Sequence, residues 1–387
     1  MQIGTVLITG ARAPVALHMA RLLRGAGHRV HLADSLRHPL AAASRMHDGY
    51  HRLPAFGTDL AGAARALRDL LERLKVDCVV PTCEEVLWLG RIWRDHPMPA
   101  PLFAPDFDRL QEVHDKARFI ALCARLGHRV PQTSVLKGPG DVAAVAARCD
   151  ALVFKPVWSR FATQTLIRPA PQRLARIRPT VEAPWVAQEF IAGQELCAYA
   201  VAHDGRVAAL AVYRGVIRAG LGAAVTFAPV RDMAVEGFVR AFVAATGWTG
   251  QISFDLIHRA DGAVLPIECN PRATSGLHFF RNPAEFSRAL RGEGEVSPDV
   301  DSPQGVRLAL WLYGVPAALR PGGWQAFRAA RRDTGNVMDW PGDRLSLRDQ
   351  LRPVAEFARI ALRHRISLQA ASTRDIEWNG PDHNSMS

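Results

Sequence analysis

Two hydrophobic periodicities alternate along the first 80 residues. Residues 3–8 form an apolar run typical of a buried strand, and residues 14–25 repeat apolar side chains at helical spacing. A second apolar run at 30–33 and a helical pattern over 60–74 lead to a third run at 78–80. Strands and helices that alternate with short turns predict an open parallel sheet of the Rossmann-like type.

The pattern changes near residue 113. A helix is expected over 115–126, followed up to about residue 270 by short strands rich in Val, Phe and Ile, and the proline- and arginine-rich stretch 166–184 is expected to be a surface connection. After residue 303 the pattern weakens, apart from a basic helix over 347–362. We expect that helix to pack on the body through Leu351, Val354, Phe357 and Leu362.

Composition narrows the class of protein. The 387 residues are 48% apolar and 22% charged, which predicts a soluble globular protein of two or three domains. No apolar run is long enough for a membrane span, and no basic leader precedes the first strand, so we expect a cytoplasmic protein. The six cysteines are scattered without a CxxC pair, which fits reduced thiols.

The net charge of +11 raises the question of nucleic-acid binding. The excess consists of 44 arginines against four lysines, and acidic residues interleave with them nearly everywhere. No stretch combines basic and aromatic residues as a nucleic-acid groove does, so we expect no nucleic-acid partner. A basic surface favours anionic small molecules instead.

The segment 250–272 carries the most specific chemistry. Two alternating runs flank Asp261-Gly262, which predicts a hairpin with a two-residue type I′ turn. With that turn, Asp255 lies directly opposite Glu268. Asn270 is two residues further on and points to the same side.

The opposite side of this hairpin is apolar and is expected to face the core, with Ile252, Phe254, Leu256, Leu265, Ile267 and Cys269. Two opposed carboxylates repel each other unless a cation lies between them, and carboxylate and amide oxygens suit Mg²⁺. A solvated face whose acids pair with Arg272 or another arginine is the alternative.

Two further strands carry polar side chains. Lys155 ends the apolar run 151–155, where it could act as a point charge for phosphate oxygens. The strand at 185–191 could offer backbone groups to a flat adenine edge, and Glu195 follows it at a distance suited to ribose hydroxyls. Taken singly, each segment is more often a plain core strand.

In this order the segments resemble the ATP-grasp superfamily, which includes biotin carboxylase, D-alanine–D-alanine ligase and the large subunit of carbamoyl-phosphate synthetase. The resemblance covers residues 1–290, and its most specific part is Glu-Cys-Asn-Pro-Arg at 268–272, which matches the family's E-x-N-P-R run. It implies a mixed α/β and α+β architecture with four parts: a Rossmann-like pre-ATP-grasp domain (1–112), a small lobe (113–186), a large lobe with the metal-binding hairpin (187–295) and a C-terminal extension (296–387).

The resemblance also implies roles for individual residues. The ligands of Mg²⁺, or of Mn²⁺ as an alternative, would be Asp255, Glu268 and Asn270. ATP would be held by Lys116, Lys155, Gln188, Glu189, Ile191 and Glu195. Arg272 would stabilise charge on the transferred phosphoryl group. The family's glycine-rich flap is absent after Lys155, where Ser159, Arg160 and Thr163 could supply side-chain contacts instead.

The substrate is less well defined. Arg214 or Arg218 could hold a substrate carboxylate, although surface arginines are the simpler interpretation on this chain. Ser275 and Glu84 are further candidates, with helix capping as the alternative role of Glu84. No protein nucleophile is required.

The resemblance implies an ADP-forming ligase that activates a small carboxylate as an acyl phosphate and joins it to an amine or similar nucleophile. The alternatives are a bicarbonate-using enzyme of the carboxylase or carbamoyl-phosphate type, and a nucleotide-binding module without catalysis. The expected partners are the two small-molecule co-substrates, with no membrane and a homodimer left open.

Overall fold

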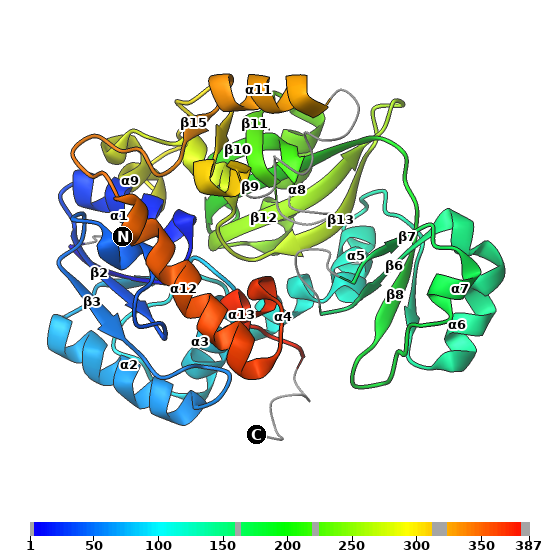
Figure 1. Cartoon of the computed structure of the whole chain (residues 1–387), viewed down its shortest axis with the longest axis horizontal. Helices are drawn as coiled ribbons and strands as arrows, with labels where there is room; N and C mark the ends of the chain where they lie inside the picture. Colours follow the sequence, from blue (N-terminus) through cyan, green and yellow to red (C-terminus); the bar gives the residue numbers. More distant parts are fainter. Residues whose placement is uncertain (1–3, 159–163, 219–223, 312–322, 381–387) are drawn as a thin grey trace.

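The computed structural model describes residues 4–158, 164–218, 224–311 and 323–380 (Figure 1). The described residues form three sheets, which lie in the N-terminal region, in a small lobe and in a large lobe that also takes in strands from the C-terminal region. The mixture of one parallel and two largely antiparallel sheets confirms the expected α/β and α+β class. Within these residues no helix has both the length and the apolar character needed to cross a bilayer.

The N-terminal sheet is parallel, with strand order β3-β2-β1-β4. Its strands are β1 (Thr5–Thr9), β2 (Arg29–Asp34), β3 (Gly49–Arg52) and β4 (Cys78–Val80). The helices of this region are α1 (Pro14–Gly25), η1 (Leu40–Ala43), α2 (Leu60–Leu74), α3 (Glu85–Asp95) and α4 (Phe107–His114). The Rossmann-like alternation predicted from the apolar runs is therefore confirmed, because apolar side chains of β1, β2 and β4 are fully buried between the helices.

The turn after β1 depends on a glycine. Gly10 has a φ of +74°, and a Cβ there would lie 2.7 Å from Thr82 Oγ1 and 2.8 Å from Glu85 Oε1. The chain must turn this closely because Thr82 Oγ1 donates to the Thr9 carbonyl and Thr9 Oγ1 donates to Glu85. Gly27 has a similar φ of +90° but has open space around it.

This contrast gives a stability prediction. We expect Gly10→Ala to lower the free energy of unfolding by about 2 kcal/mol or more, because it adds a clash to the unfavourable φ. Gly27→Ala should cost only about 1 kcal/mol, since it meets the φ penalty alone. Chemical denaturation of both variants checks this, and equal losses would contradict the crowding seen at Gly10.

The small lobe begins with α5 and is built on a second sheet of order β5-β8-β6-β7. Its elements are α5 (Lys116–Arg125), β5 (Thr133–Leu136), α6 (Pro139–Val145), η2 (Ala146–Ala151), β6 (Leu152–Pro156), β7 (Leu166–Ile167), α7 (Pro171–Leu174) and β8 (Trp185–Glu189). The expectation that 166–184 is only a surface connection is wrong. β7 pairs with β6, and Leu174 and Ile177 are buried in the core of this lobe, because apolar residues among the prolines find partners there.

The large lobe contains a seven-stranded sheet of order β13-β12-β9-β10-β11-β14-β15. Its strands are β9 (Gln194–His203), β10 (Arg206–Arg218), β11 (Ala224–Pro229), β12 (Gly250–His258), β13 (Val264–Asn270), β14 (Gln304–Gly305) and β15 (Gly335–Asn336). Its helices are α8 (Met233–Thr246), η3 (Ser275–Phe279) and α9 (Pro283–Arg291). One face packs against α8 and α5. The other packs in part against η3 and α9, which in turn contact α1.

The C-terminal region adds α11 (Gly323–Asp333), α12 (Leu347–His364) and α13 (Leu368–Thr373). The predicted basic helix is confirmed as α12, but its predicted contacts are partly wrong. Leu351 and Leu362 are 43% and 80% exposed, whereas Pro353 is buried. A helix that lies across the surface has few positions covered by the body, so not every apolar residue on it becomes core.

A C-terminal segment, residues 374–380, returns to the N-terminal domain after α13 (Figure 1). Asp375 accepts from Arg12 Nη1 at 2.5 Å and is also bonded to Ser35. Arg12 in turn pairs with Asp34 at the end of β2. The carboxyl edge of the parallel sheet, where open α/β sheets bind ligands, is thus occupied by the chain's own C-terminal segment.

A buried pair of histidines joins α1 to η3. The His18 Nε2–H group donates to the Phe280 carbonyl at 2.7 Å, and the His18 and His278 rings lie 4.7 Å apart. Burial lowers the pKa of His18 to about 3 and holds the pKa of His278 well below its usual value. Both rings are therefore neutral in the folded protein at pH 7.

The buried pair His18 and His278 predicts that the protein becomes less stable in acid. The unfolded chain binds protons at these histidines below about pH 6.5, while the folded protein does not, so the free energy of unfolding falls as the pH drops from 6.5 towards 3. For His18 alone we expect a loss of about 2 kcal/mol between pH 7 and pH 5. Denaturation at the two pH values should show a smaller loss for His18→Gln than for the control His96→Gln, which changes an exposed ring. Equal losses would contradict the prediction.

Candidate active site

The hairpin of β12 and β13 places Asp255 opposite Glu268 and Ser253 opposite Asn270, which confirms the predicted register. The predicted turn, however, is wrong. Arg259 N donates to the Ala263 carbonyl, so the loop has three residues, with Gly262 at a φ of +82°. The extra loop residue shifts the register by one, and a bulge at Ile267 shifts it back before Glu268 is reached.

The bulge also changes the apolar side of the hairpin. Five of the six predicted core residues are buried, namely Ile252, Phe254, Leu256, Leu265 and Cys269. Ile267 is the exception, being only partly buried, since a bulged residue leaves the strict alternation of the strand. Its carbonyl oxygen accepts from Lys155 Nζ at 3.2 Å.

The polar side of the sheet forms a row across four strands. Tyr213 of β10 lies opposite Cys197 of β9, Cys197 lies opposite Asp255, and Asp255 lies opposite Glu268. The Cys197 thiol donates to Asp255 Oδ1 at 3.1 Å. Burial and the nearby Glu268 carboxylate raise the pKa of Asp255 above its usual range. The sequence did not point to Cys197, because its role follows from the pairing of β9 with β12.

Two buried lysines reach this row from the small lobe and its first helix. Lys116, the first residue of α5, is 2% exposed, and its Nζ lies 3.5 Å from Glu268 Oε2 and donates to the Val157 carbonyl at 3.3 Å. Lys155 of β6 is 4% exposed. Burial lowers the pKa of Lys155 to about 8. The positive charge of Lys116 lowers this pKa further, whereas the negative charge of Glu268 raises it. Two ammonium groups and two carboxylates thus meet in one place.

Arg272 follows the hairpin directly. Its Nη2 donates to Asn270 Oδ1 at 3.0 Å, and its Nη1 donates to the Ala273 carbonyl. Ser253 Oγ donates to the Arg272 carbonyl at 2.9 Å, which holds the chain as it leaves β13. The guanidinium is partly buried beside the row of acids. The structure therefore brings together the residues of the E-x-N-P-R run and both lysines.

The end of β8 and the residues that follow it connect the two lobes. The Gln188 amide donates to Thr133 Oγ1 at 3.1 Å, Glu189 N donates to the Gln132 carbonyl, and Ile191 is buried. A Cβ at Gly193 would lie 2.6 Å from the His258 carbonyl oxygen, so this glycine allows the segment to lie against the end of the hairpin.

The remaining candidates are spread more widely. Glu195 forms an ion pair with Arg218 at 2.8 Å. Arg214 is exposed and follows Tyr213, so alternation points it to the face opposite the acidic row. Ser275 opens η3 beside Thr274, whose hydroxyl bonds to Ser253 and accepts from Tyr213.

The contacts of Glu84 are with other parts of the protein. It is buried, its Oε1 lies 3.1 Å from His114 Nε2, and it accepts from the Trp378 amide. Its carboxylate therefore ties the N-terminal domain to the C-terminal segment. Of the candidates for flap contacts, Ser159, Arg160 and Thr163 lie outside the described residues.

The oxygen atoms of the hairpin side chains could supply some, but not all, of the ligands of a hard divalent cation. Among the residues that the structure describes, no three His, Cys, Asp or Glu side chains converge as a metal-ligand group. A cation at the hairpin would therefore need the Asn270 amide oxygen besides Asp255 and Glu268, together with oxygens from a ligand. That requirement fits Mg²⁺, which is usually held by one or two carboxylates and substrate phosphates.

The architecture is that of the ATP-grasp fold. The solved structures similar to this chain include an ADP complex of an N5-carboxyaminoimidazole ribonucleotide synthetase, with a TM-score of 0.63 and 14% identity over 81% of this chain and 85% of that one. They also include the biotin carboxylase domain of Hydrogenobacter thermophilus 2-oxoglutarate carboxylase with MgADP, ADP and bicarbonate, with a TM-score of 0.60 and 13% identity over 78% and 74%. An L-amino acid ligase from Bacillus licheniformis has a TM-score of 0.57 and 17% identity over 75% of each chain. No family model and no curated protein matches the chain.

Proposed function

We propose that this protein is an ATP- and Mg²⁺-dependent ligase that activates a small carboxylate as an acyl phosphate and joins it to an amine or a similar nucleophile. One observation carries the proposal: the buried amines of Lys116 and Lys155 converge on the Asp255–Glu268 pair. Buried ammonium groups and opposed carboxylates are costly to desolvate, so such a cluster is retained where a polyanion and a cation bind. Similar folds that hold ADP or MgADP support the same proposal.

Each residue then has a defined task. Lys116 and Lys155 bind the phosphates of ATP as point charges, and Asp255, Glu268 and Asn270 hold Mg²⁺, which neutralises phosphate charge when bound. Arg272 stabilises the charge that develops on the transferred phosphoryl group. The segment of Gln188, Glu189 and Ile191 holds the adenine, and Glu195 binds the ribose.

The reaction needs no protein nucleophile. A carboxylate oxygen of the substrate attacks the γ-phosphorus and ADP leaves. The nitrogen of the amine then forms a bond to the acyl carbon, the C–O bond to phosphate breaks, and phosphate leaves with that electron pair while the nitrogen gives up a proton to solvent. The protein contributes positioning, charge stabilisation and exclusion of water. Arg218 and Ser275 are the proposed contacts of the substrate carboxylate. Arg214 was the other candidate for that contact.

A bicarbonate-using reaction is the second candidate. The Hydrogenobacter thermophilus domain, whose fold is similar, was solved with bicarbonate bound. In that case bicarbonate alone would replace the organic carboxylate, and the rest of the site would serve the same phosphoryl transfer.

Phosphate release tests both candidates. The protein is incubated with MgATP and with amino acids, other small carboxylates and bicarbonate, singly and in pairs with amines. Release that depends on an organic carboxylate and an amine supports the ligase, whereas release with bicarbonate alone supports the second candidate. Nucleotide binding without release under any of these conditions would overturn both candidates and leave a non-catalytic module.

Homodimer formation and a cytoplasmic location of the protein stay predictions.

A further inference from the structure

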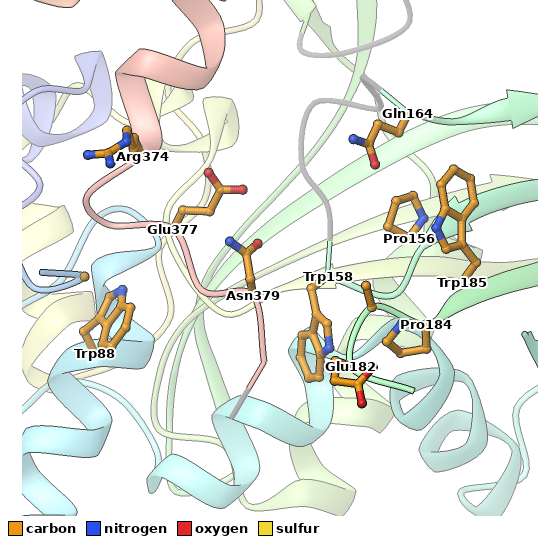
Figure 2. Close-up of a pocket in the computed structure, with 12 residues that line it drawn as sticks. Trp88, Pro156, Trp158, Gln164, Glu182, Pro184, Trp185, Arg374, Glu377 and Asn379 are labelled. Carbon is orange, nitrogen blue, oxygen red and sulfur yellow. The ribbon is translucent and has the colours of Figure 1, made fainter. Parts of the chain in front are cut away.

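A pocket of about 420 Å³ lies between the small lobe and the C-terminal segment (Figure 2). One wall is formed by Pro156, Trp158 and the loop that leads into β8, and the other by residues 374–379. Trp88 and Gly57 of the N-terminal domain complete the lining. The pocket is separate from the segment proposed to hold adenine, which lies beyond the other end of β8.

The C-terminal wall is firmly anchored. Trp378 is fully buried, with its ring 4.7 Å from that of Trp88 and 5.4 Å from that of Phe107. Trp88 Nε1 donates to the Ile376 carbonyl at 3.1 Å. At its far end the segment touches the small lobe, because a Cβ at Gly380 would lie only 2.8 Å from Trp158 Nε1. The wall is thus held at both ends.

The pocket also adjoins the proposed site of phosphoryl transfer. Val157, between two lining residues, accepts from Lys116 Nζ through its carbonyl. The ring of Trp158 lies 5.8 Å from that of His114, two residues before Lys116. A molecule held against Trp158 therefore lies near Lys116, one of the two lysines that would bind the phosphates.

The lining suits a cation with an apolar body. The two acidic residues of the lining lie on opposite walls, Glu182 on the small-lobe side and Glu377 on the C-terminal side, in a protein of net charge +11. Two partly buried tryptophans of the lining, Trp158 and Trp185, supply indole surface, which attracts cations as well as apolar groups. Both glutamates already have an interaction within the protein, but a carboxylate has about four acceptor positions and can bind a second donor.

We propose that this pocket binds the amine co-substrate in its ammonium form, with the charge between Glu182 and Glu377 and the apolar body against the indoles. The ammonium loses one proton to solvent before its nitrogen has the lone pair that attacks the acyl carbon. The role as co-substrate rests on the proposed ligase function, whereas the binding of an ammonium ion does not. Arg374, also in the lining, is the one cationic side chain among the twelve lining residues.

Binding is tested on the full chain without ATP. n-Butylamine, with butyrate as the anionic match, is titrated while the intrinsic tryptophan fluorescence is recorded. We expect saturable binding of n-butylamine, weakened about tenfold in Glu377→Gln and in Glu182→Gln, because the ammonium loses a charged partner. The control Glu293→Gln, which changes an exposed acid outside the pocket, should bind as the unaltered protein does. The two glutamates lie on different walls, so one variant still tests the proposal if the other misfolds.

Other outcomes overturn the proposal. Tighter binding of butyrate, or weakening in Arg374→Gln but not in the glutamate variants, would show an anion pocket. Unchanged binding in both glutamate variants would show that the carboxylates take no part. Because the titration needs no turnover, its failure together with amine-dependent phosphate release would refute the pocket and leave the ligase function standing. Binding of n-butylamine without any phosphate release would refute the ligase function and with it the co-substrate role, and would leave only the ammonium pocket.

Discussion

Glu268→Gln is expected to abolish Mg²⁺-dependent phosphate release, with a loss of about a thousandfold or more. The amide keeps the shape of the side chain but removes the charge that would hold the cation and that faces Lys116 Nζ at 3.5 Å. The remaining site, with two buried lysines and one carboxylate, would still attract phosphates but would not place Mg²⁺ between them. Initial rates at saturating MgATP with an active carboxylate and amine measure the effect.

The fold should survive this change. Glu268 is partly exposed, so we expect the free energy of unfolding of Glu268→Gln to stay within about 1 kcal/mol of the unaltered protein. Glu285→Gln, an exposed acid on α9 paired with Arg288, is the matched control and should keep full activity. Normal turnover in Glu268→Gln would remove the metal site from the proposal.

Trp378→Ala is expected to lower the free energy of unfolding by about 3–5 kcal/mol. The indole is fully buried between Trp88 and Phe107, so its removal leaves a cavity in the core. The backbone N–H of residue 378, which donates to Glu84, is kept in the variant, so the loss reports on the indole alone. Urea denaturation followed by circular dichroism measures the change.

Trp324→Ala provides the comparison. This indole on α11 is 51% exposed, so its removal should cost about 1 kcal/mol or less. If the two variants lost the same stability, the C-terminal segment would not be part of the cooperative fold. That result would also weaken the wall of the proposed amine pocket.

The hairpin shows how far local pattern alone can lead. The predicted two-residue turn paired Asp255 with Glu268, and the alternation of apolar and polar residues put both on the polar face, because each strand has one face that must be buried. The number of loop residues was wrong by one, and the bulge at Ile267 compensated for it. Both features follow from how the strands pack and twist against β9 and the small lobe, which the pattern of the hairpin does not contain.

Lys116 and Lys155 show what the sequence alone could not predict. Their rarity and their position in a resemblance to known enzymes singled out Lys116 and Lys155, but the sequence could not show that both are buried and face Glu268. Lys116 and Glu268 are separated by about 150 residues of chain, so only the packing of α5 against β13 brings them together. The partnership of Cys197 with Asp255 has the same origin.

Periodicity and turn residues were sufficient to place α1, α2, α12 and three strands of the N-terminal sheet, β1, β2 and β4. Each of these elements follows from burying one face of a short segment. The sequence did not predict β3. The docking of residues 374–380 onto the N-terminal domain, and the pocket that it completes, were decided by tertiary structure alone. Contacts such as those of Trp378 with Trp88 and of Asp375 with Arg12 join positions hundreds of residues apart. Such contacts leave no periodic pattern, because their energy depends on surfaces that exist only after the separate elements have packed.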